Sequence, residues 1–104
     1  MNNVKFEELT NERIKLCLST LLDKSKEYAN DTDRLRAFKA ASAIEKCTVE
    51  EALGGMMAKH IVSIYDMLPN AKSYSLEKWD EKIGDSINYL LLLNAIIKEE
   101  QDGV

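Results

Sequence analysis

A long stretch without proline near the C-terminus constrains the fold more than any other feature of the sequence. Residues 75–100 are mostly good helix formers and predict one long helix. In its second half, residues 87–97, the only polar side chains are those of Asn88, Tyr89 and Asn94. A helix without a solvated face belongs inside a bundle or at a subunit interface. The chain is therefore expected to be an all-α protein with this helix at its centre.

Asp85 lies where the last helix passes from its charged half into its apolar half. At 100° per residue it shares one side of the helix with Glu81, Asn88 and Tyr89. A carboxylate that loses hydration needs a cation or a hydrogen-bond donor as compensation. Glu81 and Asp85 are therefore candidate ligands of a shared cation. Ordinary surface pairs with lysines of the same helix are the alternative, and the spacing alone favours that alternative.

Apolar residues recur at helical spacing in three further segments. These segments are residues 10–29, 33–46 and 49–68. Thr10 is a candidate cap for the first helix, and residues before it are expected to form a frayed lead-in. Thr48 and Glu51 have the spacing of a capping box at the start of the third helix, which Pro69 should end. With the last helix, these segments predict a single domain over residues 1–104.

The middle of the third helix carries only two side chains that can be charged, Lys59 and His60, so this helix is expected to be buried on most sides. Lys59 aligns with Asp66 on a narrow polar stripe. A largely buried ammonium needs a carboxylate or phosphate partner, which makes Lys59 the stronger functional candidate. His60 falls in an apolar stripe, where a lone histidine is more often a hydrogen-bonded core residue than a ligand. The pair Gly54-Gly55 suggests close approach of a neighbour or a kink.

Charged residues also gather at the junction before the second helix, around Arg34. Free amides at a helix start attract anions, and an arginine in the first turn adds a planar donor for phosphate. A solvated turn with capping acids is the alternative, and the residues by themselves favour it.

Composition narrows the classes of function. A net charge of −4 and a pI near 5.0 argue against bulk binding of nucleic acid, which requires a basic face. The apolar run after Tyr89 is too short to span a bilayer, and the N-terminus lacks the pattern of a signal peptide. Cys17 and Cys47 have no metal-binding spacing and are interpreted as reduced core or near-core residues. These features predict a cytoplasmic protein.

Several motifs follow one another in a recognisable order. They are Lys24-x-x-x-Tyr28, Asp33-Arg34-Leu35-x-x-Phe38-Lys39, Gly54-x-Met56-x-x-Lys59-His60, Glu81-Lys82-Ile83-Gly84-Asp85 and Asp85-x-x-Asn88-Tyr89. The Glu81 motif and the apolar helix after it resemble the Glu-Glu-Leu-Gly-Asp-Leu-Leu signature of the MazG-like, all-α nucleoside triphosphate pyrophosphohydrolases. The whole pattern is similar to small phage-borne members, sometimes described as nucleotide-modification-associated domains. The resemblance covers residues 21–97.

The resemblance implies a four-helix MazG-like bundle completed by oligomerisation as a homodimer or homotetramer, in the host cytoplasm if a phage encodes it. The implied reaction is Mg²⁺-dependent cleavage of a nucleoside triphosphate to the monophosphate and pyrophosphate. Glu81 and Asp85 would be catalytic and, with Asp66, would hold the metal. The residues implied in nucleotide binding are Lys59, Arg34, Tyr28, Asn88 and Tyr89.

Two departures from the family pattern leave other functions open. The Glu-x-x-Asp pair appears here as Lys82-x-x-Asp85, and the earlier Glu-Glu-x-x-Glu motif is not recognisable. One alternative is an inactive phage protein that sequesters a nucleotide or signal, and another is a helical oligomer that binds proteins. The sequence further predicts that the polar faces of the third and fourth helices meet. Lys59 and Asp66 would then lie opposite Glu81, Asp85 and Asn88 and form the floor of a pocket entered past Arg34.

Overall fold

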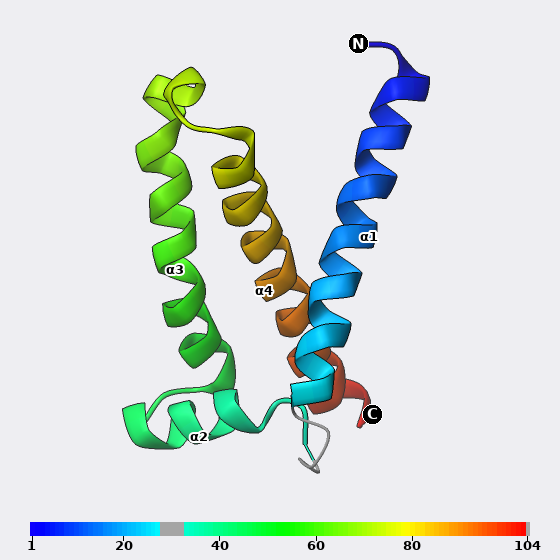
Figure 1. Cartoon of the computed structure of the whole chain (residues 1–104). Coiled ribbons are helices and arrows are strands. Elements are labelled where there is room, and N and C mark those ends of the chain that lie inside the picture. The colour runs from blue at the N-terminus through cyan, green and yellow to red at the C-terminus, as the bar shows by residue number, and fades with distance from the viewer. Residues whose placement is uncertain (28–32, 104) are drawn as a thin grey trace. The chain divides into compact units, whose positions relative to one another are not determined.

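The computed structural model describes residues 1–27 and 33–103, and within these ranges it is helical without any strand (Figure 1). This confirms the all-α class. None of the helices in the described part of the chain is long and apolar enough to cross a membrane. The chain divides into two compact units, residues 1–30 and 31–104, each of which is described by itself.

Helix α1 spans Asn3–Glu27 and is the structured part of the first unit. Its start is capped by Asn2, whose Oδ1 accepts a hydrogen bond from the Lys5 amide at 2.9 Å. The predicted start at Thr10 is therefore wrong, because Asn2 supplies a cap and no proline or glycine interrupts the residues between it and Glu27. The predicted end at residue 29 lies outside the described residues.

Helix α2, Arg36–Glu45, opens the second unit and begins later than the predicted residue 33. Asp33 explains the delay, because its Oδ1 accepts the Leu35 amide at 2.9 Å and forms a turn ahead of the helix. The helix ends at Lys46, whose φ of 58° is in the left-handed region that glycine usually occupies at this position.

Helix α3, Val49–Met67, begins with the predicted capping box. The Glu51 amide donates to Thr48 Oγ1 at 3.0 Å, and the Thr48 amide donates to Glu51 Oε1 at 3.1 Å. The helix is unbroken at Gly54 and Gly55, and a Cβ built at either glycine would meet no described atom within 4 Å apart from its chain neighbours and the nearby backbone of α3 itself. Neither a kink nor a close neighbour accounts for this pair.

The short 3₁₀ helix η1, Leu68–Ser73, connects α3 to α4 where the sequence predicts a loop. Helix α4 spans Leu76–Asp102 and is capped as predicted, since Ser75 Oγ accepts the Lys78 amide at 3.1 Å. The indole Nε1 of Trp79 donates to the Ala71 carbonyl at 2.9 Å. This bond holds η1 against the first turn of α4.

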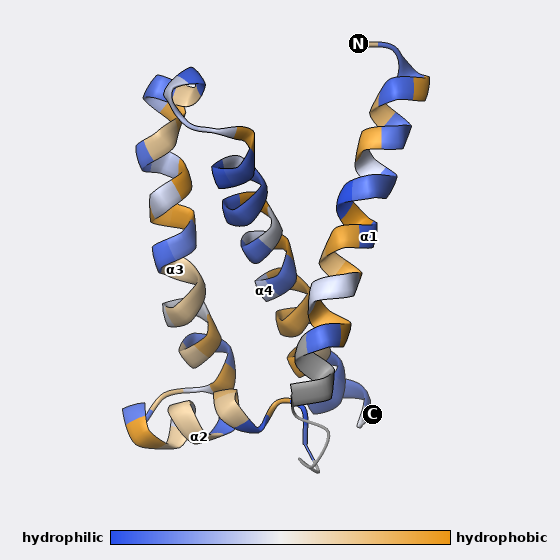
Figure 2. Ribbon diagram, in the orientation of Figure 1, coloured by the Kyte–Doolittle hydropathy of each residue, from blue (hydrophilic) through white to orange (hydrophobic). Residues whose placement is uncertain are grey.

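Helices α3 and α4 run antiparallel and in contact, and α2 packs against α3 (Figure 1). The centre of the core consists of Leu35, Phe38, Leu53 and Ile96. Partly buried residues surround it, namely Val49, Met56, Tyr89, Leu92 and Leu93. Figure 2 shows the first half of α4 to be mostly hydrophilic, so the apolar contact with α3 depends on the later turns.

Candidate functional site

The contact between α3 and α4 brings together His60 and Asp85, the one histidine of the chain and the carboxylate singled out from the sequence. His60 Nδ1 lies 3.6 Å from Asp85 Oδ2. The two side chains are 17% and 37% exposed, respectively, so the histidine lies deeper than the carboxylate. A separation of 3.6 Å is too long for a hydrogen bond, and the two side chains form an ion pair only when His60 is protonated.

His60 Nδ1 is buried and has no hydrogen-bond partner in the described part of the chain. The interpretation of His60 as a hydrogen-bonded core residue is therefore wrong for this atom. A buried polar atom that lacks a partner costs about 1–3 kcal/mol, which a bound ligand or ion would recover. Because the Asp85 side chain is partly exposed, a ligand or ion can reach this site from solvent.

Two further residues of α4 belong to this site. The Tyr89 ring lies against the imidazole of His60, with ring centroids 5.2 Å apart and planes tilted by 36°. Asn88, one turn after Asp85, has a buried Oδ1 without a hydrogen-bond partner among the described residues. We refer to His60, Asp85, Asn88 and Tyr89 together as the seam site.

The structure places the other predicted residues of these two helices outside the seam site. The side chains of Lys59, Asp66 and Glu81 are exposed and form no hydrogen bond or ion pair within the described ranges. The expectation of a buried Lys59 opposite Asp85 is wrong, because successive helical residues differ by 100° and the α3 stripe that faces α4 contains His60. The contact predicted between the two helices is therefore made by His60.

The predicted Mg²⁺ ligands Glu81, Asp85 and Asp66 are not gathered. Residues 1–27 and 33–103 contain no group of three or more His, Cys, Asp or Glu side chains able to hold a metal ion. Mg²⁺ requires a near-octahedral set of oxygen donors, whereas His60, which lies 3.6 Å from the Asp85 carboxylate, offers a nitrogen. Mg²⁺ binding by Glu81, Asp85 and Asp66 therefore stays a prediction.

The junction before α2 is organised around Lys39. The ammonium of Lys39 binds the Asp33 carboxylate and, at 2.6 Å, Glu99 near the end of α4. The hydrogen bond from Lys39, followed by that from the Leu35 amide, holds the pKa of Asp33 below its usual value. The same two carboxylates, Asp33 first, raise the pKa of Lys39. Arg34 is half-buried in this turn, and Tyr28 lies outside the described residues.

A second pair of acids joins α3 to α4. The hydrogen bond with Glu50, in the first turn of α3, raises the pKa of the Glu100 carboxyl, and burial adds to this effect. This hydrogen bond does not involve Glu50 Oε1, which is buried and lacks a partner in the described residues. These two acids share one proton more readily than they ionise together. Spacing along the chain carries no signal for this contact, because the two residues are far apart in sequence.

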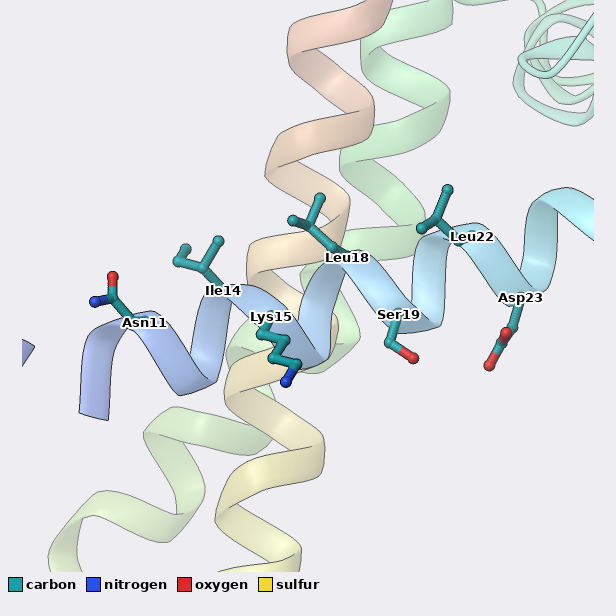
Figure 3. Close-up of a pocket in the computed structure, with 7 residues that line it drawn as sticks. All are labelled: Asn11, Ile14, Lys15, Leu18, Ser19, Leu22 and Asp23. Carbon is teal, nitrogen blue, oxygen red and sulfur yellow. The ribbon is translucent and has the colours of Figure 1, made fainter. Parts of the chain in front are cut away.

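An open groove runs along one side of α1 and is lined by apolar and polar side chains of that helix (Figure 3). The lining residues are Asn11, Ile14, Lys15, Leu18, Ser19, Leu22 and Asp23. A smaller hollow is lined by η1, residues 68–73. Neither hollow contains a residue of the seam site.

The cysteines agree with their expected positions. Cys17 is buried, Cys47 is half-buried, and no disulfide joins them. Burial, followed by the hydrogen bond with Glu45, raises the pKa of the Cys47 thiol. A raised thiol pKa lowers the fraction of reactive thiolate.

Comparison of the chain with protein-family models, with curated proteins and with solved structures finds no match. The chemistry of the seam site is therefore the firmest guide to function.

Proposed function

We propose that this chain is a MazG-like protein that binds a nucleotide or a nucleotide-derived small molecule at the seam site. Two buried polar atoms, His60 Nδ1 and Asn88 Oδ1, carry the proposal, because neither has a hydrogen-bond partner in the described residues. The Tyr89 ring and the partly exposed Asp85 carboxylate belong to the same site. Such atoms raise the free energy of the empty protein, and a ligand that satisfies them gains affinity.

The three α4 side chains of the seam site each have a chemical role in this proposal. Asp85 accepts a hydrogen bond from a ring N–H or a sugar hydroxyl of the ligand, and Asn88 offers an amide oxygen for a second donor. Tyr89 supplies an aromatic face for a base. Together these groups recognise a planar ligand that carries hydrogen-bond donors, which describes a nucleobase better than a free phosphate.

Binding without hydrolysis has more support than catalysis. Phosphoryl chemistry of the MazG type needs several carboxylates around Mg²⁺, and the described residues do not gather them. Hydrolysis to the monophosphate and pyrophosphate remains the second candidate, because exposed Glu81 lies one turn before Asp85 on α4 and is available to a metal that the substrate brings. A protein that binds without hydrolysing would act by sequestering its ligand.

Two readouts taken together test the proposal. Purified protein is incubated with a panel of ribo- and deoxyribonucleotides, with and without Mg²⁺, and both thermal stability and pyrophosphate release are recorded. Stabilisation by a subset of nucleotides without pyrophosphate release is the expected result. Stabilisation together with pyrophosphate release would establish hydrolysis, the second candidate. Absence of both would refute nucleotide binding and favour a role in protein interaction.

Substitution of Asp85 connects the readout to the site. Asp85→Asn should abolish the nucleotide-dependent rise in Tm, because it removes the negative charge and replaces one of the two acceptor oxygens by a donor. Asp102→Asn is the matched control on the same helix, since Asp102 is exposed at the far end of α4 and pairs with Lys98 at 3.7 Å. If Asp85→Asn and Asp102→Asn respond equally to nucleotides, the ligand binds elsewhere.

A further inference from the structure

The pairing of His60 with Asp85 has a geometry that hydrogen bonding does not explain. A direct N–H···O bond requires about 2.7–3.2 Å between the heavy atoms, and these atoms are 3.6 Å apart. His60 Nδ1 is nevertheless buried and directed toward a carboxylate, without any other partner among the described residues. The space between the two atoms is thus wider than a hydrogen bond and narrower than a hydrogen-bonded water bridge would need.

The separation agrees with the distance between two ligands of one metal ion. Zn–N and Zn–O bonds are about 2.0–2.2 Å long, so two donors bound to the same tetrahedral ion lie roughly 3.4 Å apart. The observed 3.6 Å differs from this value by about 0.2 Å, the usual tolerance for a metal site. His60 and Asp85 therefore need little movement to share an ion.

The chemistry of the donors selects the class of ion. An imidazole nitrogen favours zinc, cobalt, nickel and similar divalent ions, whereas Mg²⁺ and Ca²⁺ favour oxygen donors. We propose that His60 Nδ1 and Asp85 Oδ2 bind a divalent first-row transition metal between α3 and α4. The remaining coordination positions face the exposed edge of Asp85 and are filled by water.

Two features of the surroundings support this site. The Tyr89 ring, 5.2 Å from the imidazole between centroids, restricts the tilt of His60 and so keeps Nδ1 directed at Asp85. The two ligands come from different helices, so the ion links α3 to α4. Binding to the folded form alone would stabilise it in proportion to metal concentration. The inference goes beyond nucleotide binding and does not depend on it.

Metal binding is tested on the full chain without nucleotide. Thermal unfolding is measured in Zn²⁺, Co²⁺ or Ni²⁺ and compared with Mg²⁺ at equal concentration. The transition metals should raise Tm while Mg²⁺ leaves it unchanged, and the rise should disappear in His60→Gln and in Asp85→Asn. Asp102→Asn and Cys47→Ser are the controls, and both should retain the metal-dependent rise in Tm. Retention in Cys47→Ser would exclude metal binding through the Cys47 thiol. No rise in the wild type, an equal rise with Mg²⁺, or a rise that survives His60→Gln would overturn the proposal.

A spectroscopic measurement keeps the test decisive even if a variant fails to fold. Because the chain has one histidine, the imidazole resonances of the wild type report on His60 alone. Addition of diamagnetic Zn²⁺ should shift the ring resonances in a saturable way, and acidification should reverse the shift because protons compete with metal for the imidazole. Ring resonances that do not respond to Zn²⁺ at neutral pH would refute the site.

Discussion

Leu53 offers the clearest test of how the second unit is held together. Its side chain is 0% exposed and lies among Leu35 and Phe38 of the α2 region and Ile96 of α4. Leu53→Ala removes three carbon atoms at about 0.8 kcal/mol each and leaves a cavity that partial relaxation does not close. The expected loss is about 3 kcal/mol of unfolding free energy, or roughly 10–20 °C in Tm for a domain of this size.

Leu76→Ala is the matched control for this experiment, because Leu76 begins α4 and is 82% exposed. The same chemical change there should alter the unfolding free energy by no more than about 0.5 kcal/mol. Urea denaturation followed by circular dichroism and by the fluorescence of Trp79, the one tryptophan, measures both variants. Ile96→Val, which removes one methylene from the same core, should cost about 1 kcal/mol. Equal stabilities of Leu53→Ala and Leu76→Ala would refute this account of the core.

Four other predictions concern the helix ends, the charged contacts and assembly. Thr48→Ala should lower the unfolding free energy by about 1 kcal/mol in urea denaturation through loss of the α3 cap, and an unchanged midpoint would contradict it. Lys39 lowers the pKa of Asp33, so their contact stabilises the fold above the unfolded pKa of Asp33, and this stabilisation is lost as pH falls through the folded pKa. Lys39→Met should therefore flatten the acid side of a curve of Tm against pH. Glu50 raises the pKa of Glu100, so the fold loses stability as pH rises through the folded pKa of Glu100. Glu100→Gln should therefore raise Tm at pH 7 but not at pH 3. Light scattering should give a mass above that of the 11.8 kDa monomer, and a monomer at high micromolar concentration would refute oligomerisation.

The helices are predictable where local signals agree with one another. The third helix is expected over residues 49–68 and is found at Val49–Met67, because a capping box marks its start and Pro69 lies just beyond its end. The last helix is expected over residues 75–100 and spans Leu76–Asp102. It extends beyond the prediction because Gly103, with a φ of 69°, caps it in the left-handed conformation.

The first helix shows where such signals mislead. Thr10 is a good capping residue by type, yet it lies inside α1, because the chain is already helical from Asn3 onward. A capping residue within a helix costs little when its side chain is exposed, so residue type alone does not locate an end. The weak apolar pattern before Thr10 gives no reason to extend the helix.

The candidate site is only partly accessible to sequence reasoning. A carboxylate entering an apolar stretch needs a partner, which singles out Asp85, but the polar stripe of the third helix assigns that partner to Lys59. The choice between Lys59 and His60 depends on how α3 is rotated about its axis against α4, and on the heights at which the two helices meet. Those two quantities are set by packing of the whole core around Leu53, which periodicity does not encode.

The glycine pair of α3 divides that helix into two parts with different mechanical properties. Before it, the capping box and the buried Leu53 hold residues 49–53 to the rest of the core. A Cβ built at either glycine would meet no described atom within 4 Å apart from its chain neighbours and the nearby backbone of α3, and each glycine weakens the helix by about 1 kcal/mol relative to alanine. Amide hydrogens just after Gly55 should therefore exchange with solvent sooner than those of residues 49–53. Local opening of α3 should therefore begin closer to His60 than to the core anchor at Leu53.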